Sequence, residues 1–168
     1  MPLPDRPVDA AEIATEWGQE IHDRVFAPSG GWFHGTTGTS VGTTFSKQNL
    51  SLADEDPGGF LDAGNNQVEV PTGKEGLYTV FVQLNTVNGS AGAGQGTRSV
   101  LRLNGTNVSY GKEDNNGGTN ITFAITWVGV LAAGDILSVY SQRIGAGTSP
   151  DVTVDSFILY RHGAEFGA

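Results

Sequence analysis

Apolar and polar residues alternate in short runs through most of the chain, which is the pattern of half-buried β-strands. The clearest run is 119–131, in which apolar side chains occupy every second position: Ile121, Phe123, Ile125 and Trp127. The segment 77–84 is rich in β-branched and aromatic residues, which favour strands. Similar runs, separated by glycine, asparagine or aspartate, lie at 68–70, 98–103, 106–110, 136–140 and 152–160. Because no helical segments alternate with these strands, the pattern predicts an all-β sandwich, jelly roll or barrel.

The first 28 residues follow a different period. Residues 1–8 contain three prolines and predict an extended arm. Asp9 can cap a helix, and Glu12 lies three positions later, as in a capping box. Apolar residues then recur at three- and four-residue spacing, which places them on one stripe of a helix: Ala10, Ile13, Ala14, Trp17, Ile21 and Val25. Pro28 ends this element, so the sequence predicts an arm and one short α-helix at 1–28, followed by a β domain at 29–168.

A single helix of this length is marginal in water, so its apolar stripe must pack on something. Three alternatives remain open at this point: packing on its own domain, bundling with sister chains, or docking into a socket on a larger partner. In each case the residues that we expect to make the contact are Ile13, Trp17, Ile21 and Val25.

Two segments, 88–96 and 111–118, are rich in glycine and asparagine and predict mobile surface loops. Loops at the ends of a sandwich often carry binding sites. The loop residues that we expect to make outward contacts are Asn88, Gln95, Asp114 and Asn115.

Composition narrows the possible functions. The formal net charge is −9, which disfavours a general nucleic-acid binder. Cysteine is absent, which excludes disulfides, thiol nucleophiles and cysteine-bound zinc. No apolar stretch approaches the ~20 residues that span a bilayer, and the N-terminus lacks the layout of a signal peptide. We therefore expect a soluble protein without membrane insertion, which is either intracellular or released by a route other than a cleaved signal. The absence of cysteine permits folding in a reducing cytosol.

Candidate catalytic and metal-binding motifs are weak. Ser40 lies in a G-x-S-x-G match at 38–42, but the nucleophile elbow of a hydrolase needs a helix after the serine, and the residues that follow resemble a strand. The histidines, His22, His34 and His162, show no metal-ligand spacing. The acidic turns at 54–59 and 113–117 do not complete an EF-hand loop, although the sequence leaves calcium binding open. We predict a protein that is not an enzyme and that needs no cofactor or metal.

Four strand and turn motifs occur in a fixed order along the β domain. They are Val70-Pro71 followed by Gly76-Leu77-Tyr78-Thr79-Val80, then Leu103-Asn104-Gly105 with Val108, then the run 131–139 (LAAGDILSV), and finally Ser156-Phe157-Ile158-Leu159. In this order they resemble the strand motifs of the C1q/TNF-like jelly-roll family.

That resemblance implies a sandwich of about ten strands that assembles as a tight homotrimer, binds protein or glycan partners and does no catalysis. In such trimers, strand residues face the threefold axis. The candidates for the trimer core are Tyr78, Phe123, Trp127, Tyr140 and Phe157.

The arm and helix stand where animal members of that family carry a collagen stalk, and the cysteines of those members are missing. This combination resembles virion proteins of tailed bacteriophages. The resulting hypothesis is a homotrimeric structural protein on the virion surface, either a capsid decoration (head fibre) or a fibre-like appendage, attached to capsid or tail proteins through residues 1–28. The alternative is a trimeric receptor-binding head of a tail appendage, which would recognise host glycan or protein. The sequence leaves head or tail location open.

Overall fold

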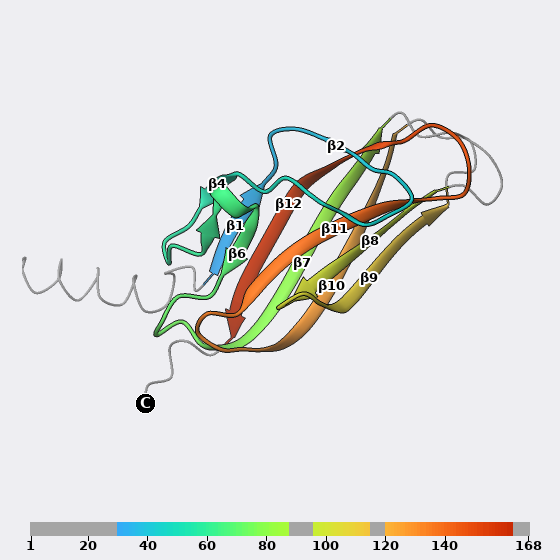
Figure 1. Ribbon diagram of the computed structural model, residues 1–168. Coiled ribbons are helices and arrows are strands. Elements are labelled where there is room, and N and C mark those ends of the chain that lie inside the picture. Colours follow the sequence, from blue (N-terminus) through green and yellow to red (C-terminus); the bar gives the residue numbers. More distant parts are fainter. Residues whose placement is uncertain (1–29, 88–95, 115–119, 163–168) are drawn as a thin grey trace, which may run out of the picture.

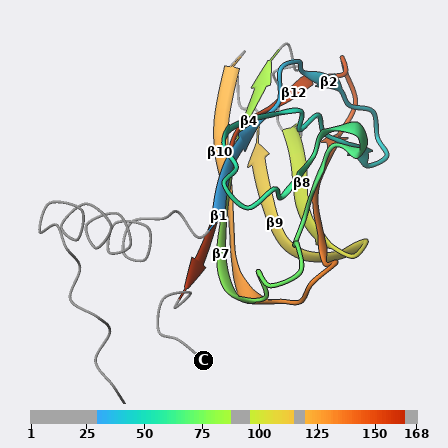
Figure 2. The same cartoon turned by 90° about the vertical axis from the view of Figure 1, so that its left-hand side faces the viewer.

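The computed structural model describes residues 30–87, 96–114 and 120–162, which form a sandwich of two antiparallel sheets (Figures 1 and 2). The first sheet has the order β10-β7-β12-β1-β4, and β2 pairs with β12. The second has the order β5-β6-β11-β8-β9, and β3 pairs with β11. The predicted all-β sandwich is therefore confirmed, with twelve strands among the described residues instead of about ten.

Each strand expected from the alternating pattern is present. The first sheet consists of β1 (Gly30–His34), β2 (Thr39–Ser40), β4 (Leu52–Glu55), β7 (Gly76–Val87), β10 (Asn120–Leu131) and β12 (Asp151–His162). The second consists of β3 (Ser46–Lys47), β5 (Leu61–Asp62), β6 (Gln67–Glu69), β8 (Gly96–Leu103), β9 (Thr106–Asp114) and β11 (Ile136–Ile144). The strands β2, β3 and β5 have two residues each, too few to leave an alternating pattern in the sequence.

Some predictions fall partly or wholly outside the described residues. The predicted loop at 111–118 is corrected in its first half, because residues 111–114 continue β9 in pairing with β8. Gly96, the last residue of the other predicted loop, already belongs to β8. The remainder of both loops lies outside the described residues, as do the predicted arm and helix. The division of the chain near residue 28 thus stays a prediction.

From β6 onward the chain changes sheets at almost every connection, which produces a jelly-roll arrangement. Two predicted turns lie side by side at one end of the sandwich. Asn104 and Gly105 have positive φ angles, as a tight hairpin turn requires. The Asn104 side chain donates to Asp135 Oδ1 at 2.7 Å and accepts from the Ile136 backbone N–H at 2.9 Å. The asparagine therefore ties the β8–β9 hairpin to the turn before β11.

The core lies between the two sheets and is built from the inward half of each alternating strand. Tyr78, Val80, Val82 and Leu84 of β7 are all fully buried. The ring of Phe157 on β12 packs against the ring of Phe33 on β1, with the ring planes tilted by 60° and the centroids 6.1 Å apart. Leu101 and Val139 contribute to the same cluster from the second sheet. Burial of this apolar surface is the main source of stability for the fold.

Tyr78 gives the fold a dependence on alkaline pH. Its hydroxyl donates to the Lys74 carbonyl oxygen, and burial raises the pKa of the Tyr78 hydroxyl above its ordinary value. Folded protein therefore keeps a proton that unfolded protein loses above pH ~10, so this contribution is full below that pH and is lost as pH rises further. We expect Tyr78→Phe to flatten the loss of unfolding free energy between pH 9 and 11, as measured by urea denaturation.

The control for that measurement is Tyr160→Phe, because Tyr160 is an exposed tyrosine. Its pH profile should follow that of the wild type. Equal slopes for all three proteins would contradict a role of Tyr78 ionisation in alkaline unfolding.

Candidate functional site

The outer face of the first sheet carries large apolar side chains that the sandwich core does not use. On β12, Phe157 and Leu159 point into the core. The alternate residues, Ile158 and Tyr160, are exposed on the outer face. Similar outward positions on the neighbouring strands complete a surface that we call the apolar band: Trp32, Leu77, Phe81, Val128, Val130, Ile158 and Tyr160.

Strand register makes the apolar band continuous, because residues directly opposite each other share a face. Ile158 pairs with Trp32 on one side and with Phe81 on the other. One row further along, Tyr160 pairs with Thr79, which in turn pairs with Val128. In the last row Leu77 pairs with Val130, which is 72% exposed. The apolar band thus crosses four neighbouring strands without interruption by a charged residue of β7 or β10.

The other end of the same face is polar. Gln83 pairs with Ala124 and Ser156, and Asn85 pairs with Thr122 and Thr153. The outer face is therefore graded along its strands, from polar at one end to apolar at the other. β1 begins at Gly30, opposite Tyr160, at the apolar end of this face.

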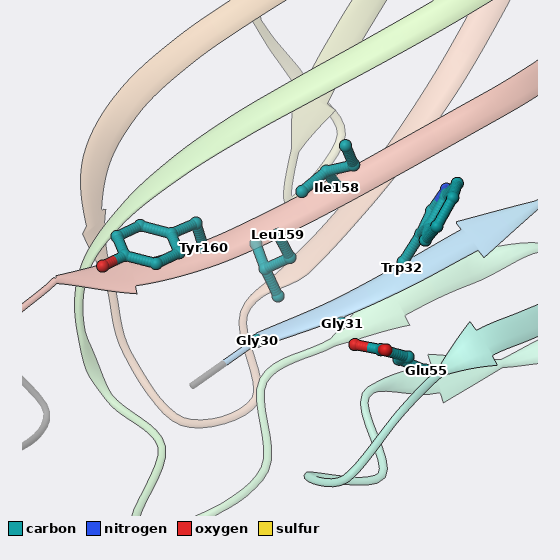
Figure 3. A pocket seen from close by; sticks show the side chains of 7 residues that line it. All are labelled: Gly30, Gly31, Trp32, Glu55, Ile158, Leu159 and Tyr160. Carbon is teal, nitrogen blue, oxygen red and sulfur yellow. The ribbon is translucent and has the colours of Figure 1, made fainter. Parts of the chain in front are cut away.

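A shallow pocket of about 210 Å³ lies within the apolar band, between β1 and β12 (Figure 3). Trp32, Ile158 and Tyr160 project into it from the same side of the sheet, and Glu55 of β4 borders it. Gly30 and Gly31 line the pocket without side chains, and Gly30 lets β1 lie close to β12, because a Cβ there would lie 1.7 Å from the Leu159 carbonyl oxygen. The pocket can therefore accept an apolar group, with a carboxylate at its rim.

Contacts around Tyr160 hold the aromatic edge of this pocket. The Tyr160 ring meets the His162 ring edge to face, with centroids 5.0 Å apart. His162 Nε2 in turn lies 2.7 Å from Thr79 Oγ1, within hydrogen-bond distance. A supported ring that is nonetheless 57% exposed is suited to contact another molecule.

Four of the five predicted trimer-core residues lie on the inward side of their strands, not on this outer face. Tyr78 and Phe157 are fully buried in the core of their own chain. Phe123 and Trp127 are partly buried and pack against that core, and a Cβ at Gly129 would lie 2.2 Å from the Trp127 ring. All four side chains therefore contact the core of their own sandwich, two of them fully buried and two partly buried. The apolar side chains that the first sheet leaves exposed lie one residue along each strand, on the opposite face.

The fifth candidate, Tyr140, lies on the outer face of the second sheet. The Arg102 guanidinium carbon sits 4.0 Å from the centre of its ring, in a cation–π contact. Tyr140 is therefore placed away from the apolar band, on the other side of the molecule.

The weak chemical motifs do not form a site in the described part of the chain. Ser40 belongs to β2, opposite Asp151, and the strand β3 follows it in place of the helix that an elbow needs. His34 Nδ1 pairs with Asp54 at 3.0 Å, and both oxygens of Asp56 accept backbone N–H groups of Phe60 and Leu61. Within the described residues, no three acidic or histidine side chains come together as a metal site. The same residues contain no helix long and apolar enough to cross a bilayer.

Other predicted contact residues cannot be placed. Asn88, Gln95 and Asn115 lie outside the described residues, as do Ile13, Trp17, Ile21 and Val25. Asp114 belongs to β9, where its backbone pairs with Gly96.

The apolar band was missed from the sequence, although one signal for it exists. Four successive residues of β12, 157–160, are all apolar or aromatic. A continuous apolar run is typical of a strand that is covered by other residues on both of its faces. The run could therefore have indicated a second contact surface behind the core.

The fold defines a two-layer antiparallel jelly-roll sandwich. No protein-family model matches the chain, and no curated protein matches it. Among solved structures, the globular domain of zebrafish complement 1qA protein is similar at 10% sequence identity, with a TM-score of 0.49 over 79% of this chain and 97% of that chain.

Proposed function

We propose that this chain is a homotrimeric, non-enzymatic structural protein on the surface of a tailed-bacteriophage virion. The observation that supports self-association is the apolar band. Scattered apolar residues are normal on a protein surface, but contiguous patches of this kind mark interaction sites. Seven large side chains on four neighbouring strands make such a patch.

The apolar band has two parts that fit a head-to-tail contact between copies. Val128 and Val130 protrude from β10, which lies at one end of the first sheet, and the pocket beside Trp32 lies across the same sheet. In the proposed assembly, β10 of one copy packs over the pocket of the next. Such heterologous contacts form a ring when the rotation closes. That the ring has three members rests on the resemblance of the strand motifs to the C1q/TNF-like family.

The proposed mechanism in the virion is passive. Residues 1–28 attach the trimer to capsid or tail proteins, and the sandwich is displayed to solvent after folding in the host cytoplasm. Three identical outer surfaces would raise weak contacts to useful avidity. The net charge of −9 suits a displayed surface that stays soluble.

Light scattering on the full chain, and on a chain without residues 1–28, tests this proposal. We expect both to have the mass of three chains, because the apolar band belongs to the sandwich. A trimer that needs residues 1–28 would move the interface to the predicted helix. Two monomeric proteins at micromolar concentration would contradict the trimer.

The second candidate function is a trimeric receptor-binding head of a tail appendage. The observation that favours it is a basic and aromatic surface on the second sheet, opposite the apolar band.

A further inference from the structure

The outer face of the second sheet gathers positive charge in an otherwise acidic molecule. Four of the nine Lys and Arg residues of the chain occupy outward positions on β3, β8 and β9: Lys47, Arg98, Arg102 and Lys112. Two tyrosines, Tyr110 of β9 and Tyr140 of β11, lie among them. We call these six residues the basic face.

Register places the six residues in three adjoining rows. Val100 pairs with Tyr140 on one side and Tyr110 on the other, and Tyr140 also pairs with Lys47. On one side of this row Arg98 pairs with Lys112. On its other side Arg102 pairs with Asn107. Since paired strands are ~4.8 Å apart and rows on one face ~7 Å apart, the whole group fits under a few sugar rings or a short peptide.

Arg102 is held in the basic face by contacts with two aromatic rings and an asparagine. Its guanidinium lies over the Tyr140 ring at 4.0 Å and over the Phe45 ring at 5.4 Å. Its Nε donates to Asn107 Oδ1 at 2.9 Å. These contacts fix the plane of the guanidinium while using only one of its three nitrogens. A guanidinium held in this way is prepared to bind a carboxylate with its remaining N–H groups.

Exposure differs among the other members: Lys47 and Tyr140 are half-buried, and Lys47 Nζ donates to Gln67 Oε1 at 2.8 Å. Tyr110 is 62% exposed, and Arg98 and Lys112 are also exposed. Arg98 has no ion pair within the part of the chain that the structure describes. Gln142, which pairs with Arg98, adds an amide to the same row. Acidic residues of the same sheet lie at its borders: Glu69 pairs with Ile136, and Asp114 ends β9 two residues after Lys112.

We propose that the basic face binds a short acidic glycan whose sugar rings carry carboxylates. The arginines would pair with the carboxylates, and the exposed Tyr110 ring would stack on the apolar face of a sugar ring. The amides of Asn107 and Gln142 are placed to hydrogen-bond with hydroxyl groups.

Two other anionic ligands fit less well. A nucleic acid is a long polyanion, which would extend from these four cations over a molecule whose net charge is −9. An acidic peptide would satisfy the arginines but would leave the exposed tyrosine without a flat partner. A glycan with carboxylates on its rings offers partners to the cations and a flat apolar face to the exposed tyrosine.

This inference rests on the receptor-binding alternative, to which it gives a site and a ligand class. It concerns one face of a single chain, and that face lies opposite the apolar band. Binding and trimer mass can therefore be tested separately on the same samples.

The test is isothermal titration of the full chain with two probes, a galacturonic acid hexamer and a short sialic acid oligomer, at low salt. We expect at least one to bind, and its methyl ester, which keeps the rings but loses the charges, to bind at least tenfold more weakly. Arg98→Gln should weaken binding about tenfold, and Tyr110→Ala about fivefold. The matched control is Lys74→Gln, which removes a cation outside the basic face and should bind as the wild type does.

Several results would overturn the proposal. They are the absence of binding to either acid, equal binding of acid and ester, or unchanged binding by Arg98→Gln. Tighter binding of a single-stranded oligonucleotide or a poly-glutamate peptide than of either glycan would assign the basic face to that ligand instead. Light scattering on each variant gives the trimer mass independently, so loss of binding with an intact trimer is not a failure of assembly.

Discussion

Replacing Ile158 with aspartate should convert the proposed three-chain assembly into folded monomers. Ile158 lies at the centre of the apolar band, paired in register with Trp32 and Phe81. An unpaired carboxylate at this point of the interface would be stripped of water without a partner, which costs several kcal/mol. A ring of three copies would meet this cost at every contact. We expect the dissociation constant of each contact between two copies to rise at least about a hundredfold, equivalent to ~3 kcal/mol, as measured by light scattering over a concentration series.

The matched control is Tyr110→Asp, which places the same charge on the outer face of the second sheet. Tyr110 is 62% exposed and Ile158 is 39% exposed, so both chains should fold, as circular dichroism can verify. The Tyr110 variant should keep the mass of three chains. If the Ile158 variant also keeps that mass, the apolar band is not the interface between copies.

The strands and turns of the sandwich could be predicted because they depend on local pattern. Alternation of apolar residues indicated β7, β10 and β12, and the asparagine–glycine pair at 104–105 indicated the hairpin between β8 and β9. These signals depend on the side-chain period of a strand and on the positive φ angles that a tight turn requires. Neither depends on which strands become neighbours.

The assignment of faces could not be predicted in the same way. Alternation divides a strand into two faces, and the more apolar face is normally the buried one. In the run 157–160 of β12 both faces are apolar, so Phe157 and Ile158 are indistinguishable until the second sheet is in place. The aromatic residues first assigned to the trimer were therefore those that fill the core of a single chain, such as Tyr78 and Trp127.

The basic face depends even more on tertiary structure. Its residues come from β3, β8, β9 and β11. Within each of these strands, a lysine or arginine is typical of any position that faces solvent. Lys47 and Arg98 reach one surface only because β11 pairs with both β3 and β8. The spacing of residues along the sequence does not predict that pairing, so the basic face could not be predicted without the strand order.

The neighbouring residue, Phe157, should show the opposite behaviour to Ile158. Phe157 is fully buried, and its ring packs against Phe33 with centroids 6.1 Å apart. Replacing it with alanine removes this contact and leaves a cavity between the sheets. We expect the free energy of unfolding to fall by ~3–5 kcal/mol, a large part of the ~5–15 kcal/mol of a typical domain. Urea denaturation in the Ile158→Asp background measures this loss without a contribution from assembly.

Tyr160→Ala in the same monomeric background is the control, because it also removes an aromatic ring from β12 but on the outer face. Tyr160 is 57% exposed, so its removal should cost less than about 1 kcal/mol in a monomer. In the chain with the native Ile158, we expect the two variants to differ in the opposite sense in their effect on association. Tyr160→Ala should weaken association between copies, and Phe157→Ala should act through folding alone. If Phe157→Ala instead loses no more stability than Tyr160→Ala in the monomer, the two faces of β12 have been assigned the wrong way round. Phe157 would then return as a candidate for the contact between copies.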